Sequence, residues 1–472
     1  MAFRVRDLGP HGKFCHELQL EALERIIPRE EVQCVLAEHG AEAIRVRKLS
    51  MEVVVWWLIA LNLYTDASLG YAFEKMSHSL RLLWPHDPCP LPRASALVYR
   101  RYQLRSRPLA ALFHRVCRPL ATAETPGAFL FGLRLMALDG HVEPVPDTPA
   151  NDACFGRGGS QRGPAAFPQV RIVSLCECGT HVVVDATFWP VHTGEITGAH
   201  RLLRSITKGM LVLWDRNFYQ YEFLKALTAR GAHVLGRINR MIVPRFHQAL
   251  PDGSYLAWIR PKKGARQGRG RLLVRIIEYT LDDPRRPGHQ ERHRLLTTLV
   301  DAEQAPAFEL VMAYHERWEF ELMVDELTTH QLVGDRRPLR SQKPVGVIQE
   351  LYALLIAHYA VRALIHASAQ EAEVDPDRIS FLRALRLVRE AIADFQLSAR
   401  RWHGQLWARL LSEVRRELLP PRRLRLNPRA VKRKMSNFPL KRKKDPQWLE
   451  PLLPFEAVIR LTGPAVEVGS AI

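Results

Sequence analysis

The stretch LRLMALDG, residues 133–140, decides how the rest of the chain is interpreted. Its first six residues are apolar except Arg134, and the run ends in Asp139. A short apolar run that ends in a polar residue predicts a buried strand, which brings its last side chain to the rim of a sheet. The stretch MLVLWD, residues 210–215, repeats the pattern and ends in Asp215. Either aspartate alone could start a turn or cap the next helix, but the two together predict a shared site.

A third acid, Glu321, lies in YHERWEFELMVDEL, residues 314–327. Residues 307–333 contain no Gly or Pro, and the spacing of their apolar residues predicts a helix. Side chains three or four residues apart share one face of a helix, and here that face is polar. It carries Tyr314, Arg317, Glu321, Asp325 and Thr328. The alternative is a solvated surface stripe with an ion pair between Arg317 and Glu321, worth about 0.3–0.5 kcal/mol.

Three acids in such positions predict a metal-dependent site that cuts phosphodiester bonds. Divalent ions balance the charge on the attacking and leaving oxygens, and Mg²⁺ takes few, rigidly placed carboxylates. We therefore interpret Asp139, Asp215 and Glu321 as catalytic ligands of two Mg²⁺ or Mn²⁺ ions. Asp185 and Glu195 also lie near predicted strand or helix ends, so either could replace one of the three.

The chain resembles the bacterial insertion-sequence transposases with a ribonuclease-H-like DDE catalytic domain, of the insertion-element-four type. The hallmark of that family is a helix with Tyr, two residues, Arg, three residues, Glu, six residues and Lys. Tyr314, Arg317 and Glu321 keep this register, but Thr328 stands in place of the Lys. The blocks LDGHVEPVPDTPANDACFG and LVLWDRNFY, residues 138–156 and 211–219, also match.

This resemblance implies a DNA transposase that cleaves strands and transfers them from one site. It implies that Tyr314 and Arg317 grip the terminal phosphates of the element, that the missing Lys removes one backbone contact, and that a homodimer brings two transposon ends to target DNA. The alternatives are a structure-specific nuclease of ribonuclease-H-like fold and a catalytically inactive, transposase-derived DNA-binding protein.

The fold class that we predict is α/β, with a ribonuclease-H-like catalytic core, a β-rich insertion, and helical N- and C-terminal regions. Strands are predicted at residues 133–138, 169–176, 181–188 and 210–214, with helices at 195–206 and 219–229, and this is the element order of such a core. Because 106 residues separate Asp215 from Glu321, an insertion is expected at about 233–301. The predicted domains are 1–125 for binding DNA ends, 126–335 for catalysis, and 336–472 as a helical region with a basic tail.

Hydrophobic periodicity and turn residues place the remaining elements. Helices are predicted at residues 18–27, 30–39, 50–64, 69–76, 95–106, 109–116, 345–366 and 377–394. Strands of the insertion are predicted at 234–238, 255–259, 272–279 and 295–300. The resemblance implies that Trp258 in this insertion holds a flipped base, although a tryptophan on a strand is more often part of the core.

The charge of the chain favours a polyanionic partner. Its 68 Lys and Arg exceed its 49 Asp and Glu by 19, with a pI near 9.9, and neutralising phosphates releases counterions. Ribosomal, RNA-binding and membrane-surface proteins can be equally basic. Arg100 and Arg101, which alternate with tyrosines, are predicted to follow a DNA backbone unless they belong to a solvated helix face. Eleven Lys or Arg and no acid between residues 422 and 444 predict an arm that binds DNA without sequence preference.

Cysteine content and hydropathy indicate the compartment. Seven scattered cysteines form no disulfide framework, so we expect a reducing cytoplasm. The resemblance to bacterial transposases implies that this cytoplasm is bacterial and that the protein associates with the nucleoid. Cys176, Cys178 and His181 could suggest zinc, but no second pair at finger spacing follows them. No apolar signal opens the chain, and the most apolar stretch, residues 53–63, is too short to span a bilayer, so no membrane partner is expected.

Overall fold

The computed structural model describes residues 5–6, 17–41, 49–84, 91–160, 163–239, 241–261, 270–284, 289–332, 338–420 and 453–463. The chain divides into two compact units. The first contains Met1–Met210 and Arg317–Pro420, and the second contains Leu211–Glu316 and Pro421–Ile472. The predicted functional boundaries at residues 125 and 335 stay a prediction, while the predicted basic tail at 422–444 lies outside the described residues.

The N-terminal helices of the first unit follow the hydrophobic pattern of the sequence. They are α2 (Arg29–Glu38), α3 (Met51–Leu63), α4 (Leu69–Leu83), α5 (Ala94–Leu104) and α6 (Arg107–Val116). The side chains of Ser50 and Ser68 accept hydrogen bonds from Val53 and Tyr71 and so fix where α3 and α4 begin. The helix predicted at 18–27 is wrong, because only a 3₁₀ turn, η1 (Glu21–Leu23), forms there.

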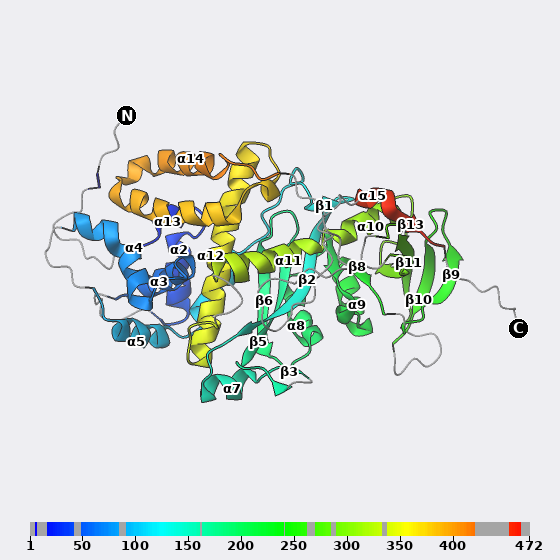
Figure 1. The fold of residues 1–472 in the computed structure, drawn as a ribbon, viewed down its shortest axis with the longest axis horizontal. Helices are drawn as coiled ribbons and strands as arrows, with labels where there is room; N and C mark the ends of the chain where they lie inside the picture. The colour runs from blue at the N-terminus through cyan, green and yellow to red at the C-terminus, as the bar shows by residue number, and fades with distance from the viewer. Residues whose placement is uncertain are drawn as a thin grey trace, which may run out of the picture. The chain divides into compact units, whose positions relative to one another are not determined.

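One long helix, α12 (Pro344–Glu371), lies at the centre of the helical part of this unit (Figure 1). It packs against α3 and α6 and against two further C-terminal helices, α13 (Phe381–Leu397) and α14 (His403–Val414). The helix predicted at 377–394 starts later, since Pro376–Arg378 forms the 3₁₀ turn η5 and Ser380 caps α13. Helix α14 was not predicted.

The first unit also contains an antiparallel sheet in the order β6, β5, β2, with β1 (Phe129–Leu130) added to β2. Its main strands are β2 (Leu133–Pro144), β5 (Gln169–Glu177) and β6 (Val183–Pro190), with α8 (Glu195–Leu202) and 3₁₀ turn η2 (Leu203–Ser205) following β6. Helix α8 packs against β5 and β6. Between β2 and β5 lie α7 (Pro149–Phe155) and the short pair β3 (Gly159–Ser160) and β4 (Gly163–Pro164).

The second unit starts with a parallel pair joined by a helix. Strand β7 (Met210–Trp214), 3₁₀ turn η3 (Arg216–Phe218), α9 (Tyr221–Ala229) and β8 (His233–Arg237) form this crossover. Trp214 is in register with Gly236, where a Cβ atom would meet the indole ring at 1.9 Å. Glycine is therefore required for β8 to pass the buried tryptophan.

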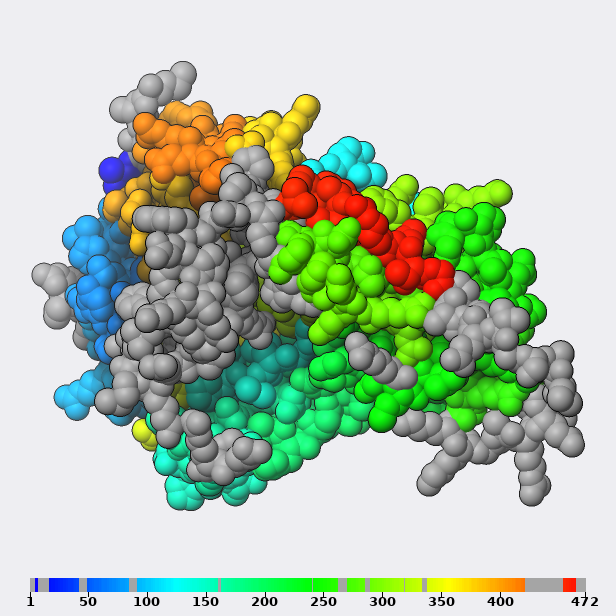
Figure 2. All heavy atoms as spheres, turned by 45° about the vertical axis from the view of Figure 1, so that its right-hand side comes forward, coloured from blue at the N-terminus to red at the C-terminus, as the bar shows by residue number. Residues whose placement is uncertain are grey.

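An antiparallel sheet extends from β8 and forms the β-rich insertion. Its strands follow in the order β12 (His293–Thr297), β11 (Leu272–Leu281), β10 (Tyr255–Ile259) and β9 (Arg245–Ala249). Helix α10 (Ala307–His315) belongs to the same unit. The segment α15 (Phe455–Val458) and β13 (Ile459–Leu461), red in Figure 2, lies beside α10, with Phe455 stacked on His315 and β13 paired with β11.

The predicted order of strands and helices is confirmed, and so is the mixed α/β class with a β-rich insertion. Two strand predictions need correction. Strand β2 does not end at residue 138 but continues to Pro144, and β9 was not predicted. The burial of β2 explains the first error, because its fully buried run ends at Leu138 while its backbone pairing with β5 continues.

Candidate active site

Asp139 lies within β2, at the point where the strand changes from buried to partly exposed residues. It is in register with Ser174 of β5, so the backbone on both sides of it is held by the sheet. Its Oδ1 atom accepts a hydrogen bond from the backbone N–H of Gly140 at 2.8 Å. A side chain on a paired strand is held more rigidly than one on a loop, which suits a metal ligand.

Arg317 is the cation next to this carboxylate. Its Nη1 atom donates to Oδ2 of Asp139 at 2.7 Å, and both side chains are partly buried, at 13% and 20% exposed. The alternative offered by the sequence was an ion pair between Arg317 and Glu321, and the structure shows that Arg317 also has Asp139 as a partner. The carboxylate therefore already attracts positive charge on its Oδ2 side, as a metal ligand should.

Glu321 lies on helix α11 (Trp318–Asp325), half-buried. Helix α11 packs against β2, so the third acid is carried on an element in contact with the strand of Asp139. The predicted continuous helix over 307–333 is wrong, because α10 ends at His315 and a turn at Glu316 and Arg317 precedes α11. The five-residue polar stripe is therefore divided between two helices.

Beyond α11 the helix widens to a π-helix, η4 (Glu326–Gln331), which contains Thr328. Thr328 donates its hydroxyl to the carbonyl of Val324 at 2.8 Å. It also lines an open cavity of about 450 Å³. The other lining residues are His141, Val142, Glu143, Pro144, Ala165, Ala166, Phe167, Gln169, Val324 and Pro338. Since residues 139, 141 and 143 of a strand share one face, this cavity continues the face of Asp139.

Asp215 follows β7 in the second unit and is half-buried. It occupies the position before 3₁₀ turn η3, but its side chain does not cap that turn. Its carbonyl does accept a hydrogen bond from the backbone N–H of Phe218 at 3.0 Å, so Asp215 starts this turn, as one form of the alternative expected, while its side chain is not used as a cap. As predicted, this carboxylate comes directly after a strand whose five residues are all buried.

Asp185 and Glu195, the two acids that could replace one of the three predicted ligands, differ in their contacts. Asp185 is fully buried. Its carboxylate accepts hydrogen bonds from Nη2 and Nε of Arg204, at 2.7 and 2.8 Å, and from the hydroxyl of Ser205. This pairing makes it a structural carboxylate. Glu195 pairs with Arg171 at 2.7 Å, and its carboxylate lies about 3.0 Å from where a Cβ atom of Gly140 would be. Of the two, Glu195 is the one next to the segment of Asp139.

Predicted DNA-contacting residues in the second unit have different exposures. Trp258 is half-buried rather than part of the core, with His247 beside it and the guanidinium of Arg271 5.6 Å from its ring. Tyr314 is only 5% exposed and lies near Tyr279. Its ring thus packs inside this unit, which differs from the exposed phosphate contact that the resemblance implied. Most of the stretch 260–271 of the insertion, which is rich in Lys and Arg, lies outside the described residues.

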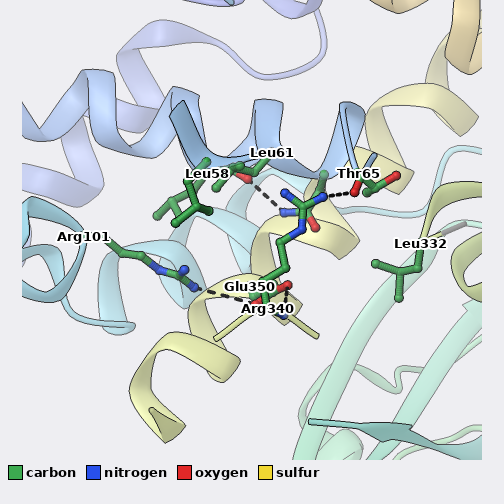
Figure 3. Close-up of a pocket in the computed structure, with 9 residues that line it drawn as sticks. Leu58, Leu61, Thr65, Arg101, Leu332, Arg340 and Glu350 are labelled. Atoms are coloured by element: carbon green, nitrogen blue, oxygen red, sulfur yellow. Dashed lines mark hydrogen bonds and ion pairs between the residues drawn. The ribbon is translucent and has the colours of Figure 1, made fainter. Parts of the chain in front are cut away.

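Of the two predicted α5 arginines, Arg101 needs correction. It is 4% exposed, and its guanidinium lies beside Glu350 (Figure 3). The same guanidinium donates to Gln349, Ser341 and the carbonyl of Gly346. Such a buried, fully engaged arginine ties α5 to α12 and is not available to DNA. Arg100 is half-buried and donates to the carbonyl of Leu49, so only Arg100 keeps the predicted role.

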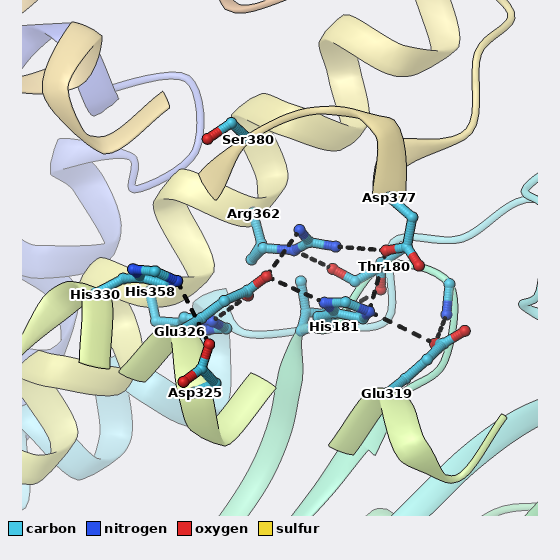
Figure 4. A network of polar contacts seen from close by, with 12 residues as sticks. Thr180, His181, Glu319, Asp325, Glu326, His330, His358, Arg362, Asp377 and Ser380 are labelled. Atoms are coloured by element: carbon cyan, nitrogen blue, oxygen red, sulfur yellow. Dashed lines mark hydrogen bonds and ion pairs between the residues drawn. The ribbon is translucent and has the colours of Figure 1, made fainter. Parts of the chain in front are cut away.

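A buried polar cluster beneath α11 was not predicted (Figure 4). Glu326 is 4% exposed and is surrounded by His181 at 3.3 Å, His358 at 3.1 Å and Arg362 at 3.4 Å. Burial alone would raise the pKa of Glu326, but Arg362 and His181 lower it well below its usual range. The residues come from three distant segments, so no local spacing indicates them. Cys176 and Cys178 near His181 are buried and form no disulfide.

Helix α12 is long and apolar enough to cross a membrane by composition, but 78% of its apolar window is buried inside the protein. Its apolar residues are accounted for by packing against α3, α6, α13 and α14. A helix of this kind is expected at the centre of a helical bundle.

A carboxylate on β2 with a further acid on a helix that contacts this strand, and a carboxylate directly after β7, are side chains of the kind found in a metal-dependent class of phosphodiester-processing protein. Comparison with known proteins identifies the member of that class. Residues 17–114 match the family Insertion element 4 transposase N-terminal, and residues 131–359 match Transposase DDE domain. The DDE domain implies dependence on a divalent metal ion.

Two proteins of Escherichia coli (strain K12) are similar to the chain. Transposase InsG for insertion sequence element IS4 is 29% identical over 432 residues, 90% of this chain and 95% of the relative. Putative transposase InsZ is 26% identical over 224 residues, 44% of this chain and 67% of the relative. A cryo-EM structure of the piggyBac transposase synaptic complex with hairpin DNA covers 83% of this chain and 85% of its own, with a TM-score of 0.44 and 12% identity.

The chain belongs to the DDE transposases of the insertion-element-4 type. It is an enzyme that cleaves DNA strands and transfers them, and its catalytic core is ribonuclease-H-like.

Proposed function

We propose that Asp139, Asp215 and Glu321 are the catalytic carboxylates of this transposase and that they hold two Mg²⁺ or Mn²⁺ ions. The observation that carries the proposal is the contact between α11, with Glu321, and β2, where Asp139 already binds the guanidinium of Arg317 at 2.7 Å. Oxygen donors on rigid elements fit hard divalent ions. When bound, such ions activate a water or a 3′-hydroxyl and stabilise the departing oxygen.

Arg317 would serve the same site by holding a phosphate of the DNA strand. A guanidinium matches two phosphate oxygens at once and stays charged at all physiological pH values. In the absence of DNA it rests on Asp139, which keeps it oriented. Because Asp139 is partly exposed, the pair can separate at little cost when a phosphate arrives.

DNA contacts outside the carboxylates would come from Arg100, from Trp258 and from the strongly basic composition of the chain. Trp258 has a half-buried ring on the insertion, and we propose that it stacks on an unpaired base. For Tyr314, whose ring is buried, we propose that it positions the start of α11 and acts on phosphates through Arg317.

The DNA substrate that we propose is an insertion sequence related to the IS4 element named for the similar InsG protein. Two transposon ends must be brought together for transfer, so the active form would be a homodimer. We place the enzyme in a bacterial cytoplasm, associated with the nucleoid and not with a membrane.

A plasmid excision assay with candidate terminal repeats tests the proposal. Asp139→Asn, Asp215→Asn and Glu321→Gln should each abolish cleavage but leave end binding within about tenfold, because charge supplies most of the affinity. Glu195→Gln is the matched control and should cut normally. If Glu195→Gln fails and one of the three variants cuts, Glu195 belongs to the site instead. Cleavage without joining would identify a nuclease, and binding without cleavage an inactive derivative.

A further inference from the structure

A second group of metal-binding side chains lies in the first unit, in the buried polar cluster beneath α11. His181 follows the turn after β5, Glu319 lies on α11, and Asp377 lies in η5 before α13. Their ligand atoms all lie within 4.8 Å of one another. Figure 4 shows the three side chains directed toward the same point from three elements.

The distances fit one ion between these side chains. Nε2 of His181 is 3.2 Å from Oδ1 of Asp377 and 3.8 Å from Oε2 of Glu319. Ligand atoms about 2.0–2.2 Å from a tetrahedral zinc ion are separated by about 3.4 Å. Small side-chain adjustments would therefore complete the site, with water in the remaining position.

His181 is prepared for this role by its neighbour Glu326. Nδ1 of His181 lies 3.3 Å from Oε1 of Glu326, so a carboxylate is in place to accept the N–H of this ring nitrogen when Nε2 binds a metal ion. A histidine that binds a metal usually donates its other N–H to a carboxylate in this way.

Two buried atoms at the centre have unused bonding capacity. His181 is 0% exposed, and among the described residues neither its Nε2 nor Oδ1 of Asp377 makes a hydrogen bond. His181 also has a φ of 58°, a strained value for a histidine. The backbone of His181 therefore holds Nε2 close to two carboxylates, where this atom has capacity left to bind a metal ion.

The cluster is rich in negative charge. Glu319, Glu326 and Asp377 are three carboxylates, and Arg362 is a permanent cation beside two of them. Burial lowers the pKa of His358 next to Glu326, so this imidazole adds little charge near neutral pH. A divalent ion would add positive charge beside these carboxylates.

We propose that His181, Glu319 and Asp377 bind one divalent transition-metal ion of the zinc class, in addition to the catalytic ions. Residues 319 and 321 lie about 200° apart around a helix, so α11 would carry Glu319 to this ion and Glu321 away from it. The ion would join α11 to the β5–β6 turn and to η5, and so fix the helix of the third catalytic acid. Imidazole and burial select zinc over Mg²⁺.

Equilibrium dialysis of the full chain against Zn²⁺ in excess Mg²⁺ tests this site. The measurement uses the Glu321→Gln background, so that ions on the catalytic carboxylates do not contribute. One Zn²⁺ per chain should be retained, and Asp377→Asn should weaken its binding by about 100-fold. Asp325→Asn is the matched control, since this exposed acid at the end of α11 lies outside the site, and it should retain the ion.

X-ray absorption of the bound ion provides a second measurement that does not need a variant. It should show one imidazole nitrogen with oxygen ligands and no sulfur. Retention of no Zn²⁺, equal retention by Asp377→Asn and Asp325→Asn, or sulfur ligands from Cys176 or Cys178 would overturn the proposal. These outcomes leave the excision assay unaffected, so they are distinct from failure of the proposed catalytic site.

Discussion

Two arginine–carboxylate pairs lie at the two ends of α11 and differ mainly in burial. At the N-terminal end, Arg317 and Asp139 are 13% and 20% exposed and 2.7 Å apart. At the C-terminal end, Arg362 and Glu326 are 1% and 5% exposed and 3.4 Å apart. The Arg317–Asp139 pair is therefore partly exposed to solvent, and the Arg362–Glu326 pair is buried.

The difference separates a pair that can exchange partners from one that cannot. A partly exposed pair gains little from its contact, since water replaces either partner at low cost. A buried pair cannot lose one partner without leaving an uncompensated charge in the interior. We therefore expect the Arg317 pair to serve catalysis and the Arg362 pair to serve stability.

The largest effect is expected for Arg362→Met, which should lower the free energy of unfolding by about 3–5 kcal/mol. The substitution keeps the side-chain volume but leaves Glu326 and Asp377 without their permanent cation. Thermal or urea unfolding of the variant measures this loss. Arg317→Met is its control and should cost about 1 kcal/mol. Equal losses for the two variants would contradict the comparison.

The next effect concerns catalysis, where substitution of Arg317 should cost more than substitution of Arg362. Arg317→Met should reduce cleavage by about 10²-fold, the usual cost of one lost electrostatic contact to a reacting group. Arg317→Lys should not restore it, because an ammonium cannot bind two oxygens in a planar fork. Single-turnover cleavage of a labelled transposon end measures both variants. Full activity of Arg317→Lys would show that only the charge matters.

The sequence could predict those features of the fold and of the candidate site that depend on local patterns. The runs that end in Asp139 and Asp215, and the Tyr314, Arg317 and Glu321 spacing, are local patterns, so they indicated the core and its acids. The order of strands and helices followed from hydrophobic periodicity for the same reason. Local patterns report which residues are apolar and how they repeat.

Burial of polar residues depends instead on contacts between distant segments. Arg101 has the sequence neighbours of a DNA-binding arginine, yet residues of α12 and of the segment before it, 240 or more positions away, enclose it. The turn between α10 and α11 occurs without Gly or Pro, so it has no sequence signal. The Glu326 cluster joins residues from 181 to 377 and is likewise a tertiary feature.

A smaller effect is expected for the aromatic residues of the second unit, where exposure again separates two roles. Trp258→Ala should weaken binding of a transposon end with an unpaired base by about 1–3 kcal/mol, the value of one stacked base, and Trp258→Phe should keep most of it. Trp214 is fully buried, so Trp214→Ala should instead destabilise the fold. Fluorescence anisotropy on ends with and without an unpaired base measures the first effect. Equal losses on both substrates would exclude stacking.

The smallest effect is expected at Thr328, where the family pattern has Lys. This half-buried residue lines the cavity that continues the face of Asp139, so a longer side chain has room to point along that face. Thr328→Lys should tighten end binding and increase the salt slope, log affinity against log salt, by about one unit, because one more phosphate is neutralised. The neighbouring Thr329 is exposed, and Thr329→Lys is the matched control for added charge alone. Titrations of both variants at several salt concentrations give the two slopes. If the slopes rise equally, position 328 has no special access to the DNA backbone, and the threonine there is a neutral replacement on the π-helix.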